Sequence, residues 1–167
     1  MIKDTKLLLN RVVSQFQLGI HSPHGASHWG RVKTNGFEIA KYTEGANLEV
    51  IELFAFFHDS RRLNDGYDPD HGERAIAFSE SLRGEYFDLP DDDFELLSYA
   101  CKHHTSGKTV GDITVQVCWD ADRLDLGRVG VVPHPDYLCT DHAKRPDVIE
   151  RALKRSRYFQ EDEVILI

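Results

Sequence analysis

The sequence has little cysteine: its 167 residues contain three. Cys101, Cys118 and Cys139 are widely spaced and form no CxxC pair, so neither a thiolate metal site nor a redox motif is expected. An odd number of separated cysteines also argues against a disulfide framework. A reducing compartment fits this usage best, and we expect a cytoplasmic protein.

A surplus of basic residues is also missing. Lys and Arg number 20 against 28 Asp and Glu, which gives a formal net charge of -8. Proteins that bind nucleic acid neutralise its phosphates with clustered positive charge, so polymeric nucleic acid is not expected as a partner. No long uninterrupted apolar run and no small-residue cleavage site is present, and we therefore expect no membrane association. The sequence is compatible with a homodimer.

What the sequence does contain is helical periodicity. Apolar residues recur three and four positions apart along most of the chain, which predicts an all-α protein. The predicted helices cover the first segment up to about residue 19, then residues 28–42, 48–59, 71–84, 93–104, 113–127 and 147–159. Gly36 is a weak point of the second helix, and residues 113–127 begin with strand-like alternation before favouring helix. A length of 167 residues fits one domain, 1–167, ending in the apolar tail 164–167.

Nine histidines are many for this length, and they gather at predicted helix ends and in nearby loops. The adjacent pair His58 and Asp59 ends a helix that is apolar on nearly every side. An unpaired carboxylate there would lose its hydration without compensation, and a bound cation would remove that penalty. The pair therefore predicts a metal site at the end of this helix.

Asp122 points to the same chemistry. On a helix it shares a face with Cys118 and Leu126, so its carboxylate should face the core. Asp120 shares a face with Gln116 and is expected to be more solvated. Asp125 has two interpretations, a partner of a metal ligand or an ordinary surface charge.

Two imidazoles and two carboxylates suit a first-row divalent ion and leave room for water. The order His28, then His58 and Asp59 within FFHD, then Asp122 within ADRLD resembles the HD superfamily of metal-dependent phosphohydrolases, over roughly residues 20–130. The resemblance implies an HD-domain bundle of about five core helices plus peripheral helices, with a C-terminal loop and helix over 131–167. It also implies that these four residues bind a divalent ion, which is manganese, magnesium, iron, cobalt or zinc.

Some members of that superfamily hold a second ion, bridged by the aspartate of the HD pair. The resemblance allows such an ion here without requiring it. His71, His103 and His104 occupy the interval in which the extra histidines of those members fall. Two other interpretations stay open, because His103 and His104 can simply close a helix C-terminus and His71 can be a surface residue of a first turn.

The resemblance predicts hydrolysis of a phosphate ester or anhydride of a small molecule, with a nucleotide as the leading substrate and a metal-bound hydroxide as nucleophile. Asp59 would act at the metal, and Arg62 would neutralise phosphate oxygens unless it is a solvated charge. His71 or His104, if free of metal, would protonate the leaving oxygen. The flexible loop holding His21 and His24 is left outside the predicted site.

Two alternatives to hydrolysis stay open. A di-iron protein of the same fold could activate dioxygen to oxidise a small polar substrate, and a non-catalytic module could bind a nucleotide or metal without turnover. We further expect that Tyr137 and the Pro-rich loop around it cover the site.

Overall fold

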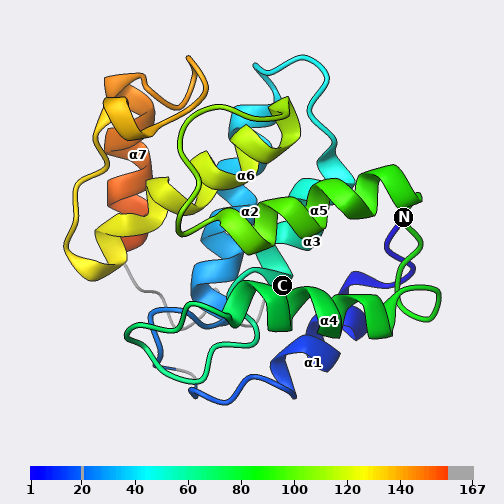
Figure 1. Cartoon of the computed structure of the whole chain (residues 1–167). Helices are drawn as coiled ribbons and strands as arrows, with labels where there is room; N and C mark the ends of the chain where they lie inside the picture. The colour runs from blue at the N-terminus through cyan, green and yellow to red at the C-terminus, as the bar shows by residue number, and fades with distance from the viewer. Residues whose placement is uncertain (20, 158–167) are drawn as a thin grey trace.

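The computed structural model describes residues 1–19 and 21–157 and shows an all-helical domain, which confirms the predicted fold class (Figure 1). The α-helices are α1 (Thr5–Val13), α2 (Ala26–Ala40), α3 (Leu48–Phe57), α4 (His71–Leu82), α5 (Asp91–His103), α6 (Ile113–Arg123) and α7 (Pro146–Arg157). Two 3₁₀ helices, η1 (Leu124–Val129) and η2 (Pro135–Tyr137), follow α6. The described residues form no strand and only two isolated bridges. The predicted end of the last helix at 159 and the tail 164–167 lie outside them.

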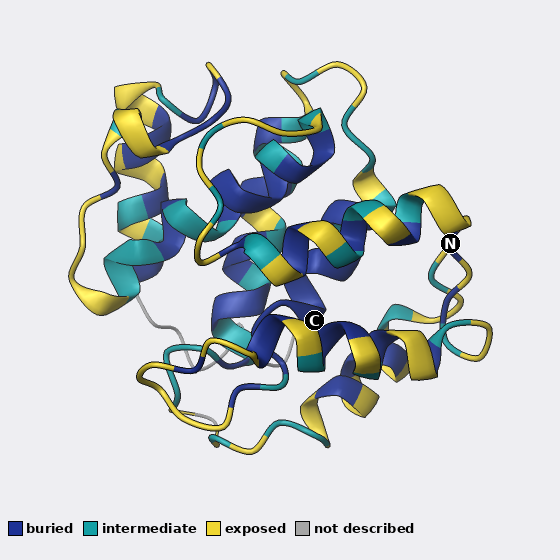
Figure 2. Ribbon diagram, in the orientation of Figure 1, coloured by how far each residue is buried: buried dark blue, intermediate teal, exposed yellow. Residues whose placement is uncertain are grey.

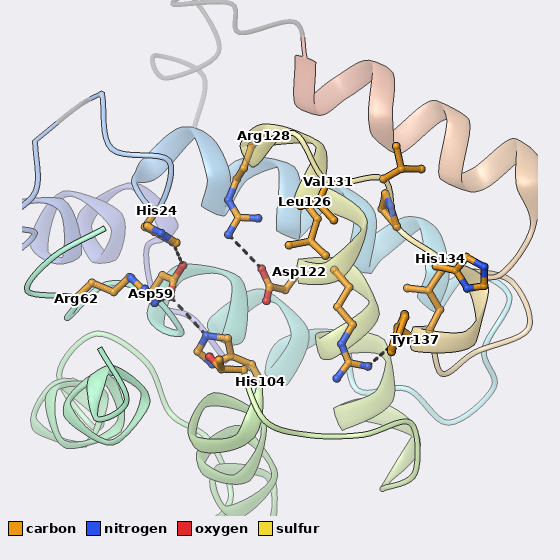
Figure 3. A pocket seen from close by; sticks show the side chains of 15 residues that line it. His24, Asp59, Arg62, His104, Asp122, Leu126, Arg128, Val131, His134 and Tyr137 are labelled. Carbon is orange, nitrogen blue, oxygen red and sulfur yellow. Dashed lines mark hydrogen bonds and ion pairs between the residues drawn. The ribbon is translucent and has the colours of Figure 1, made fainter. Parts of the chain in front are cut away.

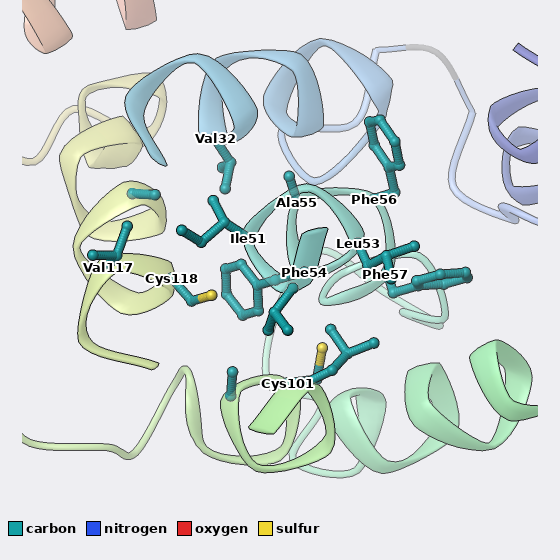
Figure 4. Close-up of a cluster of buried hydrophobic side chains, with 14 of the residues drawn as sticks. Val32, Ile51, Leu53, Phe54, Ala55, Phe56, Phe57, Cys101, Val117 and Cys118 are labelled. Atoms are coloured by element: carbon teal, nitrogen blue, oxygen red, sulfur yellow. The ribbon is translucent and has the colours of Figure 1, made fainter. Parts of the chain in front are cut away.

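Helix α3 forms the middle of the bundle. Its sequence, LEVIELFAFF, is apolar on nearly every side, and α1, α2, α4, α5 and α6 all pack against it. Figure 2 shows its ribbon buried, and Figure 4 shows Phe54 and Ile51 surrounded by side chains of the neighbouring helices. Asn47 begins the helix by accepting hydrogen bonds from the backbone N–H groups of Glu49 and Val50. The polar residues that end α3 are therefore held at the centre of the molecule.

Gly36 is a contact point between two helices. Helix α2 crosses α3 so closely there that a Cβ on Gly36 would lie 2.5 Å from Cγ2 of Ile51. The residue that weakens α2 as a helix is thus the one that lets α2 approach α3. This approach brings the first turn of α2 close to the end of α3.

The segment after α6 belongs to the same packed body. Helix α7 packs on η1 and α2, and Arg155 donates hydrogen bonds to Asn35 and Glu38 on α2. The expectation of a solvated Asp120 is wrong, because its buried carboxylate accepts hydrogen bonds from the backbone N–H groups of Cys139 and Thr140 at 2.6 and 2.8 Å. Helical periodicity could not reveal these contacts, since residues 139 and 140 come from a later loop.

Membrane-spanning segments were sought among residues 1–19 and 21–157. No helix there is both long enough and apolar enough to cross a membrane.

Candidate metal centre

Helix ends from five parts of the chain meet at one buried point. His58 and Asp59 directly follow α3, His28 lies in the first turn of α2, Asp122 lies near the end of α6, His71 begins α4, and His104 follows α5. All except Asp122 are buried at the residue level, and the side chain of Asp122 is 13% exposed. The structure therefore brings together the four predicted ligands of the first ion and two of the three residues predicted for a second.

The first group of metal-ligating side chains contains His28, His58 and Asp59. The Nε2 atoms of the two histidines lie 3.0 Å apart, and Asp59 Oδ2 lies 3.6 Å from His28 Nε2 and 3.7 Å from His58 Nε2. Asp122 faces the same point, with its Oδ1 at 3.4 Å from His28 Nε2. That oxygen is buried and has no hydrogen-bond partner among the described residues, which leaves a lone pair free for a ligand.

The second group contains Asp59, His71 and His104. The two Nε2 atoms lie 2.9 Å apart, and Asp59 Oδ1 lies 3.2 Å from His71 and 3.5 Å from His104. One carboxylate thus turns each of its oxygens to a different pair of imidazoles. His103 joins neither group in the described part of the chain, because its ring lies instead against Tyr99 on the outer side of α5.

The orientation of the four imidazoles is set by their outer nitrogens. In each ring Nδ1 faces an oxygen on the protein, and the ring must donate Nδ1–H wherever that oxygen belongs to a carbonyl. The acceptors are the carbonyl oxygens of Phe54 for His58, Cys101 for His104 and Asp68 for His71, and the carboxylate of Asp125 for His28. A ring that is neutral and donates Nδ1–H turns the lone pair of Nε2 inward, as in metal-binding histidines.

Electrostatics favour this arrangement of donors. Burial lowers the pKa of His58 to about 3, so its ring is neutral near pH 7. Burial by itself would raise the pKa of Asp59, but the surrounding histidines outweigh it and hold that pKa well below its usual range. Burial by itself would also raise the pKa of Asp122, but its neighbours His28, His58 and Arg128 lower that pKa below its ordinary value. Near pH 7 both carboxylates are therefore ionised while His58 is neutral, and each of these forms can bind a metal ion.

The pKa of His104 is shifted in the opposite direction. Burial acts to lower it, but hydrogen bonding to Asp59 and the negative charge there raise it above the ordinary value. This shift favours the protonated ring beside the buried carboxylate. A metal ion needs the neutral ring and would therefore compete with the proton.

Asp125 proves to be the partner of a predicted ligand, and the surface-charge alternative is wrong. Its buried carboxylate lies 2.7 Å from His28 Nδ1 and accepts hydrogen bonds from Arg31 Nε at 2.7 Å and Nη2 at 3.1 Å. The guanidinium fixes the carboxylate, and the carboxylate fixes the tautomer and orientation of His28.

The donor set fits a first-row divalent cation. Neighbouring ligands about 2.1 Å from an octahedral ion lie about 3.0 Å apart. The inward nitrogens are 3.0 Å apart in the first group and 2.9 Å apart in the second. Imidazole and carboxylate donors together suit manganese, iron, cobalt and zinc. Each group can therefore hold a cation, with Asp59 shared between them.

His24 reaches the centre although the sequence interpretation left it out. Its Nδ1 lies 2.7 Å from Asp59 Oδ2. The loop is fixed by Trp29, whose Nε1–H donates to the carbonyl oxygen of His24, and by Arg128, which donates to that of Pro23. The only signal in the sequence was the spacing of four residues to His28, which carries little information when one of the two lies in a loop.

A cavity of about 430 Å³ opens beside the centre (Figure 3). Asp59, Asp122, His24 and His104 line its inner end, together with Arg62 and Arg128. Arg62 is a buried residue rather than a solvated one: its Nη1 donates to Asp59 Oδ1 at 3.3 Å, and its Nη2 donates to a loop carbonyl. The opposite side is lined by residues of the Pro-rich loop, Tyr137 among them, so the expected cover does border the cavity.

Comparisons with known proteins identify no relative: no family model, no curated protein and no solved structure matches the chain. The function must therefore be argued from the site.

Proposed function

We propose that this protein is a metal-dependent phosphohydrolase that acts on a phosphate ester or anhydride of a small molecule, with a nucleotide as the leading substrate. The observation that carries the proposal is the buried Asp59, which shares its two oxygens between two pairs of inward-facing imidazoles. The resemblance of the sequence to the HD superfamily supports it. When bound, divalent ions polarise a phosphoryl oxygen and lower the pKa of a coordinated water to about 7.

The residues of the chain divide into ligands and substrate contacts. His28, His58, Asp59 and Asp122 would hold one ion, and His71 and His104, with Asp59, would hold the second. We assign His71 and His104 to the second ion rather than to protonation of the leaving oxygen. The reason is that their Nδ1 atoms face backbone carbonyls and their Nε2 atoms face Asp59.

Two arginines would receive the phosphate. Arg128 contacts the loop carbonyl of Pro23 through Nε and the carbonyl of Asp125 through Nη1, and its Nη2 lies 3.8 Å from Asp122. Arg62 approaches Asp59 from the other side (Figure 3). A phosphate bound between Arg62 and Arg128 would meet two guanidinium groups that the protein already holds in place. Positive groups oriented in advance in this way stabilise the negative charge of a phosphoryl transition state.

The test is phosphate release from a panel of nucleotides and simple phosphate esters with manganese, magnesium, cobalt or iron. Asp59→Ala removes the shared carboxylate and should abolish release, whereas Asp88→Asn, a surface change, should leave it intact. Metal content of both variants is measured in parallel. Release that persists in Asp59→Ala, or no release with any metal, would overturn the proposal.

A second candidate is an oxygenase with two irons. The observation in its favour is the second group, in which two imidazoles accompany one carboxylate, since imidazole suits iron well. Iron retained on purification together with oxygen consumption would support it. Tight metal binding without phosphate release or oxygen consumption would instead indicate a binding module.

A further inference from the structure

The side of the cavity opposite the metal centre is mostly apolar. Its apolar side chains are Leu126, Val131, Val132, Pro133, Tyr137 and Leu138, which we call the apolar wall, and His134 lies among them. Figure 3 shows Tyr137 and His134 on the far side of the cavity from Asp59 and Arg62. Val132 is 57% exposed and Tyr137 72% exposed, so the rest of the protein leaves much of each side chain uncovered.

The apolar wall is held in place by the helix that carries Asp122. Arg123 Nη1 donates to the carbonyl oxygen of Tyr137 at 2.8 Å, and Asp120 accepts from the backbone of Cys139 and Thr140 just beyond the wall. Its other end is tied to η1 by the hydrogen bond from Val131 N to the carbonyl oxygen of Leu126. The wall therefore has a defined position relative to the metal ligand, as a specificity surface requires.

Arg62 and Arg128, two of the three arginines that line the cavity, lie beside the carboxylates of the metal centre. Arg123 also lines the cavity, but its Nη1 and Nη2 atoms donate to the carbonyls of Gly107, Lys108 and Tyr137. An anionic group is therefore best placed near Arg62 and Arg128, beside the two metal groups. Such a ligand would have its charge at one end and its remaining atoms against the wall.

From these features we infer that the substrate is a phosphate monoester whose alcohol carries an aromatic or apolar group, and that Val132 and Tyr137 determine this specificity. The inference rests on the proposed phosphohydrolase function. A sugar or polyol placed against the wall would lose hydrogen bonds to water, and few wall side chains could replace them. A planar ring would instead bury apolar surface and stack on Tyr137. A nucleobase or a phenyl ring meets this description.

The experiment compares 2-phenylethyl phosphate with ethyl phosphate, which share a primary alcohol as leaving group and differ in the ring. We expect kcat/KM to favour the phenyl compound by about tenfold. Tyr137→Ala and Val132→Thr should reduce that preference several-fold. Tyr67→Ala is the matched control, because Tyr67 is 90% exposed and does not line the cavity.

Binding gives a second readout that needs no turnover. Calorimetry on the manganese-loaded protein compares 2-phenylethylphosphonate with ethylphosphonate, and the phenyl compound should bind about tenfold more tightly. Equal affinity for the two, or an equal loss for both in Tyr137→Ala, would overturn the role of the wall. No phosphate release from either ester, with the phosphonate preference intact and sensitive to Tyr137→Ala, would overturn the phosphohydrolase function and leave the wall as the ligand-binding surface.

Discussion

Replacing Asp125 by Asn should weaken metal binding without removing a ligand. The carboxylate faces His28 Nδ1 and accepts two hydrogen bonds from Arg31, in a place with no exposure to solvent. An asparagine offers one oxygen and one NH₂ group, so it cannot keep all three contacts that the two carboxylate oxygens make with His28 and Arg31. Whichever way the amide turns, its NH₂ faces a donor of either His28 or Arg31.

The magnitude follows from these contacts. Hydrogen bonds to charged groups contribute about 1.5–3 kcal/mol each, and Arg31 also loses its buried counter-charge, so we expect the free energy of unfolding to fall by about 2–4 kcal/mol. Loss of a partner that orients a metal-binding histidine typically lowers metal affinity by about 10–100-fold. Competition with a chromogenic chelator measures the affinity, and urea unfolding of the metal-free protein measures the stability.

Asp120→Asn is the matched control, because Asp120 is equally buried and, among the described residues, its carboxylate accepts hydrogen bonds only from residues 139 and 140. It should destabilise the protein by a similar amount while leaving metal affinity within about twofold. If Asp125→Asn binds metal as tightly as the wild type, or if both variants lose affinity equally, the argument that Asp125 acts through His28 is refuted.

Three further predictions concern stability. Manganese at 100 times its Kd should stabilise the protein by about 2.7 kcal/mol, seen as a rise in Tm of about 5–10 °C, and a similar rise in Asp59→Ala would contradict the ligand assignment. Without metal, the urea midpoint should fall as the pH drops from 6.5 towards 3, because buried His58, with a pKa of about 3, protonates only on unfolding. His58→Gln should make the urea midpoint depend less on pH. An unchanged slope would contradict the assignment of this pH dependence to His58. Gly36→Ala should cost about 1–3 kcal/mol in urea unfolding, because the added Cβ would lie 2.5 Å from Ile51, and a stabilised variant would contradict that close approach.

The sequence alone predicted the helices and the position of the candidate metal site. Periodicity is local, so it predicted the fold class, and the polar pair at the end of apolar α3 marked His58 and Asp59. The helical face of Asp122 was also predictable, because its apolar neighbours lie within seven residues of it. His28 was predicted as a ligand because it precedes the FFHD and ADRLD motifs in the order that resembles the HD superfamily, and not from helical periodicity.

Tertiary packing decided the remaining features, because they depend on contacts between distant segments. His103 and His104 are adjacent, and only the docking of α5 against α3 shows that His104 faces Asp59. Asp120 is buried because residues 139 and 140 cover it, and Asp125 is buried because Arg31 reaches it from α2. Neighbours on one helix could not reveal partners about 20 or 94 residues away, and such partners determine which carboxylates are structural, which orient a ligand and which can bind an ion.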